Sequence, residues 1–281
     1  MKTLIAIISL LLAITFTGFG QNLKTEEILA KHLASIGTEK ARGAGTNVSI
    51  VGDVEFSLAR QGTHPTSGRS VFASEGTKVL FAMTFPIPTY PMEKIVFDGK
   101  DLHIDSPISG KRSVLGEYIY TNTLLIKGGL LCGVLNKGWA LNDLAGRKGK
   151  ISAGGTKKIN GKDAYVFDYD VSKGTGIHIR IFIDKETFRH VRTEYSHVVS
   201  AQMGPTPETS AQQSESYQNL TEDFSDFKTE NGLTLPRGYK ITMNFSGGGA
   251  VGGILKEYWY TFALKDFYYD QKLDPATFAA K

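Results

Sequence analysis

Two neighbouring stretches decide the fold: residues 165–171 read Tyr-Val-Phe-Asp-Tyr-Asp-Val, and residues 177–183 read Ile-His-Ile-Arg-Ile-Phe-Ile. In both, large apolar side chains recur at every second position, and mostly polar side chains fall between them. A period of two is the pattern of a β-strand with one buried face. The same alternation recurs at residues 191–196 and 257–265, and it begins at Asn47. The sequence therefore predicts a protein made mainly of β-strands.

Short turns separate the predicted strands. Asp98-Gly99, Asn160-Gly161 and Asn231-Gly232 are dipeptides that readily adopt the positive φ angles of tight hairpins, and residues 184–187 supply a further turn. Successive hairpins indicate an antiparallel meander. Residues 200–216, which are polar with two prolines, and residues 246–253, mostly glycine, are expected to form flexible loops. Since no repeat or linker divides the chain, residues 21–281 are predicted to form a single domain.

One amphipathic helix is expected before the first strand, over residues 25–36. Ile28, Leu29, Leu33 and Ile36 recur there at helical spacing, and Gly37 follows.

A second apolar segment, residues 115–144, does not alternate, and it is interrupted by glycines at positions 128, 129 and 133. Two short helices joined by a glycine hinge fit this pattern best. Because the segment is apolar on more than one face, something must cover it, and the apolar side of the sheet is the natural cover. We call residues 115–144 the lid segment.

The first twenty residues have the order of a secretory signal peptide. Lys2 precedes an apolar run over residues 4–16, and small residues lead to a cleavage site between Gly20 and Gln21. The run is shorter than the ~20 residues that span a bilayer, although an uncleaved anchor is the alternative. No cysteine lies directly after the run, so we expect no lipoprotein attachment site. We expect a periplasmic protein.

The rest of the sequence offers no catalytic, metal or cofactor motif. The single cysteine, Cys132, excludes an internal disulfide, and a formal charge of +4 argues against nucleic acid as a partner. No pair of histidines has the spacing of a zinc protease, and no Gly-x-Ser-x-Gly elbow occurs. His190, Arg192 and Glu194 alternate along one strand and are expected to form a solvated row of salt bridges.

Three stretches resemble LolA-like proteins, the periplasmic outer-membrane lipoprotein-sorting proteins and their relatives. They are residues 25–37, the hairpin at residues 183–192 and the strand–turn–strand at residues 224–236, which ends in Leu-Pro. Residues 127–139 and 273–278 are similar to an Acidobacteria-type subgroup. The similarity extends over most of the mature chain.

The resemblance implies an α+β protein: a strongly curved, unclosed antiparallel β-barrel (LolA/LolB-like) with helices covering its concave face. In that family the apolar cavity takes up acyl chains. The resemblance thus implies a monomeric, non-enzymatic carrier without cofactor for lipid or lipoprotein acyl chains, served by inner-membrane donor and outer-membrane acceptor proteins. The side chains expected to line the cavity are Tyr165, Phe167, Tyr169, Ile177, Ile179, Ile181, Val191 and Tyr195. The side chains expected to close it are Leu124, Leu125, Leu130, Leu131, Val134, Leu135 and Trp139.

Two alternatives remain at the level of sequence. The same fold with an unused cavity would suit an envelope sensor or scaffold that binds a protein partner. A hydrolase of an envelope lipid or glycan would need a general base, for which His178, His190 and His197 are the candidates.

Overall fold

The structure, a computed structural model, describes residues 23–59, 64–105, 111–170, 176–200, 215–247 and 254–279. The expected signal peptide, residues 1–20, lies outside these ranges. So do residues 201–214 and 248–253, which make up most of the two expected loops.

The described residues form α-helices, 3-10 turns (η) and strands. The helices and turns are α1 (Thr25–Ile36), α2 (Glu39–Gly43), α3 (Val114–Thr121), α4 (Leu124–Lys127), η1 (Gly133–Leu135), η2 (Ala140–Asn142) and η3 (Pro275–Phe278). The strands are β1 (Asn47–Leu58), β2 (Thr66–Glu75), β3 (Lys78–Thr84), β4 (Met92–Phe97), β5 (Leu102–Asp105), β6 (Lys150–Ile159), β7 (Lys162–Asp170), β8 (Ile177–Asp184), β9 (His190–Val199), β10 (Ser216–Glu230), β11 (Leu233–Gly247) and β12 (Ile254–Tyr269).

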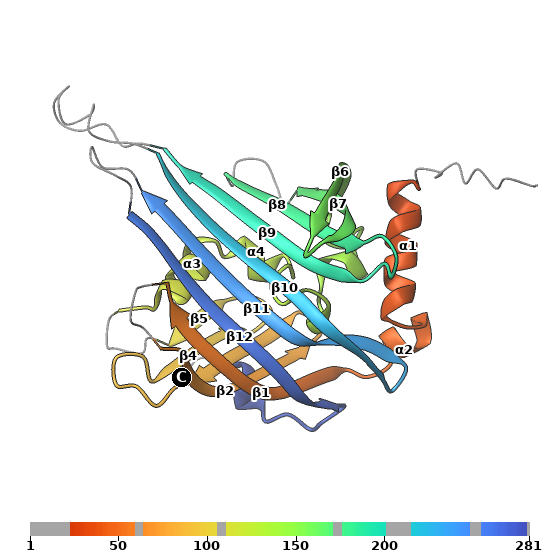
Figure 1. Ribbon diagram of the computed structural model, residues 1–281. Coiled ribbons are helices and arrows are strands. Elements are labelled where there is room, and N and C mark those ends of the chain that lie inside the picture. The colour runs from red at the N-terminus through yellow and green to blue at the C-terminus, as the bar shows by residue number, and fades with distance from the viewer. Residues whose placement is uncertain are drawn as a thin grey trace, which may run out of the picture.

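All strands that the structure describes belong to one antiparallel sheet of twelve, in the order β5-β4-β3-β2-β1-β12-β11-β10-β9-β8-β7-β6. Two meanders, β1 to β5 and β6 to β12, are joined by the pairing of β1 with β12. The sheet curls strongly, and its edge strands are β5 and β6 (Figure 1). The expected curved, unclosed antiparallel sheet with helices over its concave face is confirmed.

The topology explains why the lid segment lies on the concave face. The lid segment connects β5 to β6, which are the two opposite edges of the sheet. The chain therefore has to cross the open side from one edge to the other. Figure 1 shows α3 and α4 behind β10 to β12, inside the curve of the sheet.

The hairpin turns predicted from Asn-Gly dipeptides are present in the structure. Asn160-Gly161 and Asn231-Gly232 have positive φ angles at both residues and form the hairpin turns β6–β7 and β10–β11. Helix α1 has the bounds that its apolar spacing predicts, and α2 follows it without having been expected.

In the lid segment the expected glycine hinge is wrong. Helices α3 and α4 are joined by Asn122 and Thr123, and the glycines instead follow α4, where Gly129 has a φ of 69°.

A bulge in β9 also changes which residues share a face. Ile183 pairs with His190, but Phe182 pairs with Arg192, so Val191 is an extra residue. An inserted residue shifts the alternation of the strand by one position. Simple alternation across the bulge therefore assigns residues on one side of it to the wrong face. Val191 consequently packs with Val166 and Phe182 on the outer face, away from the main core.

The main core lies between the lid segment and the concave face and draws on both meanders. Helix α1 and the C-terminal turn η3 cover other parts of the sheet. In η3, Phe278 packs onto Ala73 and Val96. Among the described residues, no helix is both long and apolar enough to cross a membrane.

Leu125 and Leu124 provide a matched test of this packing. Leu125 is fully buried, whereas its neighbour Leu124 is 38% exposed. We expect Leu125→Ala to lower the free energy of unfolding by about 2–5 kcal/mol, because it leaves a cavity in the core. Leu124→Ala should cost less than about 1 kcal/mol. Urea unfolding of both variants checks this, and equally small losses would contradict a packed lid segment.

Candidate functional site

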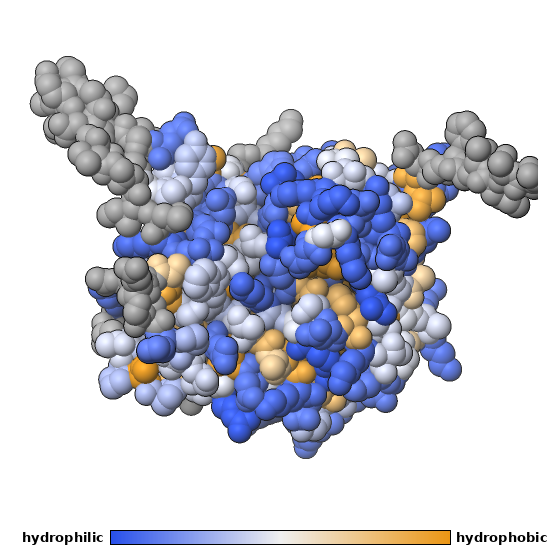
Figure 2. Space-filling model, viewed as in Figure 1, coloured by the Kyte–Doolittle hydropathy of each residue, from blue (hydrophilic) through white to orange (hydrophobic). Residues whose placement is uncertain are grey.

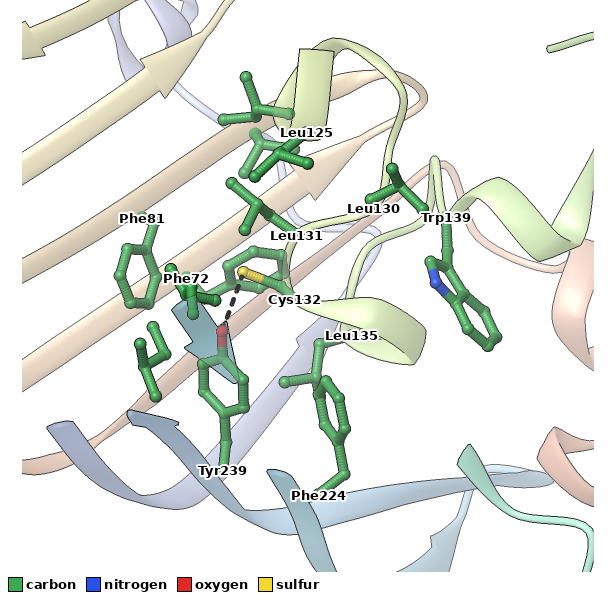
Figure 3. Close-up of a cluster of buried hydrophobic side chains, with 14 of the residues drawn as sticks. Phe72, Phe81, Leu125, Leu130, Leu131, Cys132, Leu135, Trp139, Phe224 and Tyr239 are labelled. Atoms are coloured by element: carbon green, nitrogen blue, oxygen red, sulfur yellow. Dashed lines mark hydrogen bonds between the residues drawn. The ribbon is translucent and has the colours of Figure 1, made fainter. Parts of the chain in front are cut away.

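The lid segment fills the concave face with apolar side chains. Of the residues expected to close the cavity, five are buried, Val134 is half-buried and Leu124 is exposed; the buried ones are Leu125, Leu130, Leu131, Leu135 and Trp139. Figure 3 shows Leu131, Cys132 and Leu135 of the lid segment next to Phe81, Phe224 and Tyr239 of the sheet. The lid segment is therefore part of the core in this state.

The expected wall residues divide between two places. Seven of them face or adjoin the main core under the lid segment: Tyr165, Phe167, Tyr169, Ile177, Ile179, Ile181 and Tyr195. The eighth, Val191, lies on the outer face because of the bulge. That these seven side chains line a binding site stays a prediction.

A small apolar cavity of about 20 Å³ remains between the lid segment and the sheet. Its lining is entirely apolar apart from one tyrosine and one cysteine: Val79, Phe81, Ile95, Leu115, Ile119, Ile126, Leu131, Cys132, Leu220, Tyr239 and Ile241. A space of this size has room for about one water molecule and lacks the polar partners that a water needs. An acyl chain therefore requires the lid segment to move.

A buried carboxyl group, Glu222 of β10, attaches the lid segment to the sheet next to this cavity. Glu222 Oε1 accepts hydrogen bonds from the Cys132 backbone N–H (2.7 Å) and from the Tyr239 hydroxyl (2.5 Å). Tyr195 Oη lies 2.7 Å from Glu222 Oε2 and 3.1 Å from the Leu130 carbonyl oxygen. Strands β9, β10 and β11 thus each contribute one polar side chain to a single cluster, which we call the Glu222 cluster.

The number of protons in the Glu222 cluster favours a neutral carboxyl group. Five contacts need five protons, but the Cys132 amide, the Cys132 thiol and the two tyrosines supply four. A proton on Glu222 Oε2 completes the set, since Glu222 then donates to Tyr195 and Tyr195 donates to Leu130. In agreement, burial raises the pKa of Glu222 to about 7.

A second buried carboxyl group, Glu93 of β4, lies at the start of α3. It accepts a hydrogen bond from Tyr90 (2.7 Å), and burial raises its pKa. The carboxyl group of Glu93 lies close to the backbone of α3, since a Cβ atom on Gly116 would lie 2.9 Å from Glu93 Oε1. Glycine at this position therefore allows α3 to dock against the carboxyl group.

The third polar attachment involves Ser74 of β2. Ser74 Oγ donates to the Asn136 side-chain oxygen (3.0 Å) and accepts from the Lys137 backbone N–H (3.0 Å). The same Asn136 oxygen accepts from the Gly138 backbone N–H (2.9 Å). The Glu222 and Ser74 attachments supply hydrogen bonds to the backbone N–H groups of Cys132 and Lys137, which would otherwise be unpaired in an apolar interior.

Trp139 lies between two buried histidines. Its ring stacks on His190 (centroids 4.9 Å apart) and meets His32 edge-on (5.0 Å). Burial lowers the pKa of His32 to about 4 and that of His190 well below its usual value, so both rings are neutral near pH 7. His190 is therefore not part of the expected surface row, which the bulge restricts to Arg192, Glu194 and their partners.

The outer face carries an open furrow of about 940 Å³ across β9 to β12 and β1. Its lining includes the small residues Gly238 and Ala263 and the charged residues Asp53, Lys240 and Lys265. Figure 2, which looks onto this side, shows hydrophilic side chains around pale and orange patches.

The two buried glutamates were missed by the sequence analysis, although the sequence holds a signal for them. Glu222 is in phase with the buried Leu220 and Phe224, and Glu93 is in phase with Ile95. A charged side chain at a position that alternation assigns to the core is costly unless it has partners. It therefore marks a functional or anchoring position.

No family model matches the sequence, and no curated protein matches it. Several solved structures are similar over most of the chain. A LolA superfamily protein from Nitrosomonas europaea is 16% identical, with a TM-score of 0.46, over 92% of this chain and 98% of that one. A DUF1329 family protein from Desulfovibrio piger is 10% identical (TM-score 0.46; 90% and 96% covered). A putative outer membrane lipoprotein-sorting protein domain from Vibrio parahaemolyticus is 13% identical (TM-score 0.44; 89% and 95% covered).

The first and third of these structures bear the LolA and lipoprotein-sorting names that the sequence resemblance suggests. At such low identities, the function has to be argued from this chain's own residues.

The raised pKa of Glu222 predicts a specific pH dependence of stability. From about pH 4.5 to pH 7 the unfolded chain loses this proton while the folded chain keeps it, so rising pH favours the unfolded chain. Glu222→Gln preserves the hydrogen bonds of the neutral form but does not titrate. We expect wild type to lose about 3 kcal/mol of stability relative to Glu222→Gln across this window.

Urea unfolding of both proteins between pH 4.5 and 7.5 measures this difference. His32 and His190 have lowered pKa values and make stability rise with pH, but they do so equally in both proteins. A constant difference between the two proteins would show that Glu222 is ionised in the fold.

Proposed function

We propose that this protein binds an acyl chain, of a lipid or of a lipoprotein, against its concave face and shields that chain as a non-enzymatic carrier. In this proposal residues 1–20 direct export, and residues 21–281 act in the periplasm as one domain. The wall consists of the seven inward-facing residues, and the lid segment moves aside to admit the chain.

One observation carries the proposal: the concave face is apolar, and its cover is a connecting segment rather than a further layer of regular structure. The lid segment consists of short helices and 3-10 turns, and no strand of the sheet pairs with it in the part of the chain that the structure describes. Its ends are fixed at β5 and β6. Such a segment can leave the sheet without breaking the strand ladder.

The energies of the exchange limit how much of the lid segment moves. Removing about 15 methylene groups from water is worth roughly 12 kcal/mol at ~0.8 kcal/mol each. The lid segment buries ten large apolar side chains, and exposing half of them costs roughly 7.5–15 kcal/mol at 1.5–3 kcal/mol each. In this proposal one acyl chain therefore displaces about half of the lid segment, and the near balance allows release as well as capture.

A protein-binding sensor or scaffold is the second candidate, and the outer furrow favours it. The furrow is open in the closed state of the lid segment, and both signs of charge border it. In this alternative the filled concave face serves only as the core.

A reversible disulfide between Ser74→Cys and Asn136→Cys tests the carrier. These side chains are hydrogen-bonded across the lid–sheet contact, and Cys132→Ala in the same protein prevents mispairing. We expect the oxidised protein to take up no palmitate in a native mass spectrometry titration and the reduced protein to take it up. The Ser74→Cys single variant controls for the substitution.

Uptake that is the same in the oxidised and reduced protein would place the acyl site outside the concave face. Absence of uptake in wild type as well would move the sensor or scaffold to first place.

A further inference from the structure

The Glu222 cluster is a polar island in an otherwise apolar part of the concave face. Its three side chains come from adjacent strands, and all three are fully or almost fully buried. Tyr239 and Cys132 also line the small apolar cavity, so the cavity ends at the cluster. A ligand whose acyl chain occupies the space of the lid segment therefore has its polar end near Glu222.

We propose that Glu222, with Tyr195 and Tyr239, is a subsite for an amide group attached to the acyl chain. This inference rests on the proposed function, and it names the chemical class of the ligand.

The lid segment itself shows what the subsite requires. It offers Glu222 a backbone N–H, from Cys132, and it offers Tyr195 a backbone carbonyl, from Leu130. When the lid segment leaves, Glu222 Oε1 loses one donor and Tyr195 loses its acceptor. A buried polar group without a partner is costly, so the incoming ligand has to replace both.

An acyl amide supplies an N–H donor and a carbonyl acceptor, as a peptide group does. An acyl ester supplies the carbonyl but no donor, so it leaves Glu222 Oε1 with an unfilled position. A site built to hydrogen-bond an N–H discriminates strongly against an analogue that lacks it.

Three probes of nearly equal size test the subsite: N-methylpalmitamide, methyl palmitate and N,N-dimethylpalmitamide. The first has the N–H, and the other two keep the carbonyl without it. We expect the purified wild-type protein to bind N-methylpalmitamide about tenfold more tightly than either of the others in competition titrations followed by native mass spectrometry.

Variants assign the preference to the cluster. Glu222→Gln keeps a carbonyl acceptor and should keep the preference, whereas Glu222→Met should abolish it. Glu194→Met is the matched control, since Glu194 lies on the neighbouring strand and forms ion pairs on the outer face; its preference should equal that of wild type. Should Glu222→Met fail to fold, Tyr195→Phe tests the carbonyl half of the subsite, and unchanged binding of all three probes would overturn the subsite. Tyr195→Phe removes the donor to the ligand carbonyl and should weaken all three probes while leaving the N–H preference.

The outcomes separate this inference from the proposed function. Equal binding of the amide and the ester by wild type, or a preference that survives Glu222→Met, overturns the amide subsite and leaves the carrier standing. Absence of binding by all three probes overturns the carrier itself.

Discussion

The structure depends on one constraint: an open, curved sheet cannot leave its apolar concave face in contact with water. In a closed barrel the opposite wall would cover that face, but here the edge strands β5 and β6 lie apart. The connection between these two edges supplies the cover. Because this connection crosses an apolar interior as irregular chain, its backbone needs hydrogen-bond partners there. Ser74 and Glu222 meet that need, so these two buried polar groups follow from the topology.

In the proposed function, the lid segment and an acyl chain compete for one surface. The lid segment resembles a ligand in that it is apolar along its length and polar at a few points. A covering segment of this kind keeps the concave face dry in the absence of cargo, and it limits cargo to molecules that match both features. Specificity for the cargo then comes from the hydrogen-bonding groups, and affinity comes from the apolar area. A change in one of these features need not change the other.

The sequence was sufficient for strands such as β7, β8 and β12, for the Asn-Gly hairpin turns and for α1, because alternation, turn dipeptides and helical spacing are local signals. It misplaced Val191 and His190, since a bulge shifts the register of a strand without any composition that marks it. The lid segment was recognised as covered by the sheet, but its internal shape depends on tertiary contacts rather than on propensity. The role of Glu222 was missed because its partners, Tyr195, Tyr239 and Cys132, come from distant parts of the chain.

The pairing of β1 with β12 has a consequence for the order of folding. Most neighbours in the sheet are joined by hairpins and can pair as soon as both strands exist, whereas β1 and β12 are separated by almost the whole domain. Closing so long a loop is slow, because its entropy is lost before its contacts form. Each meander can therefore assemble first, and the central seam of the sheet joins them last. A chain truncated before β12 would leave β1 as an exposed edge strand, which is a template for association with other chains.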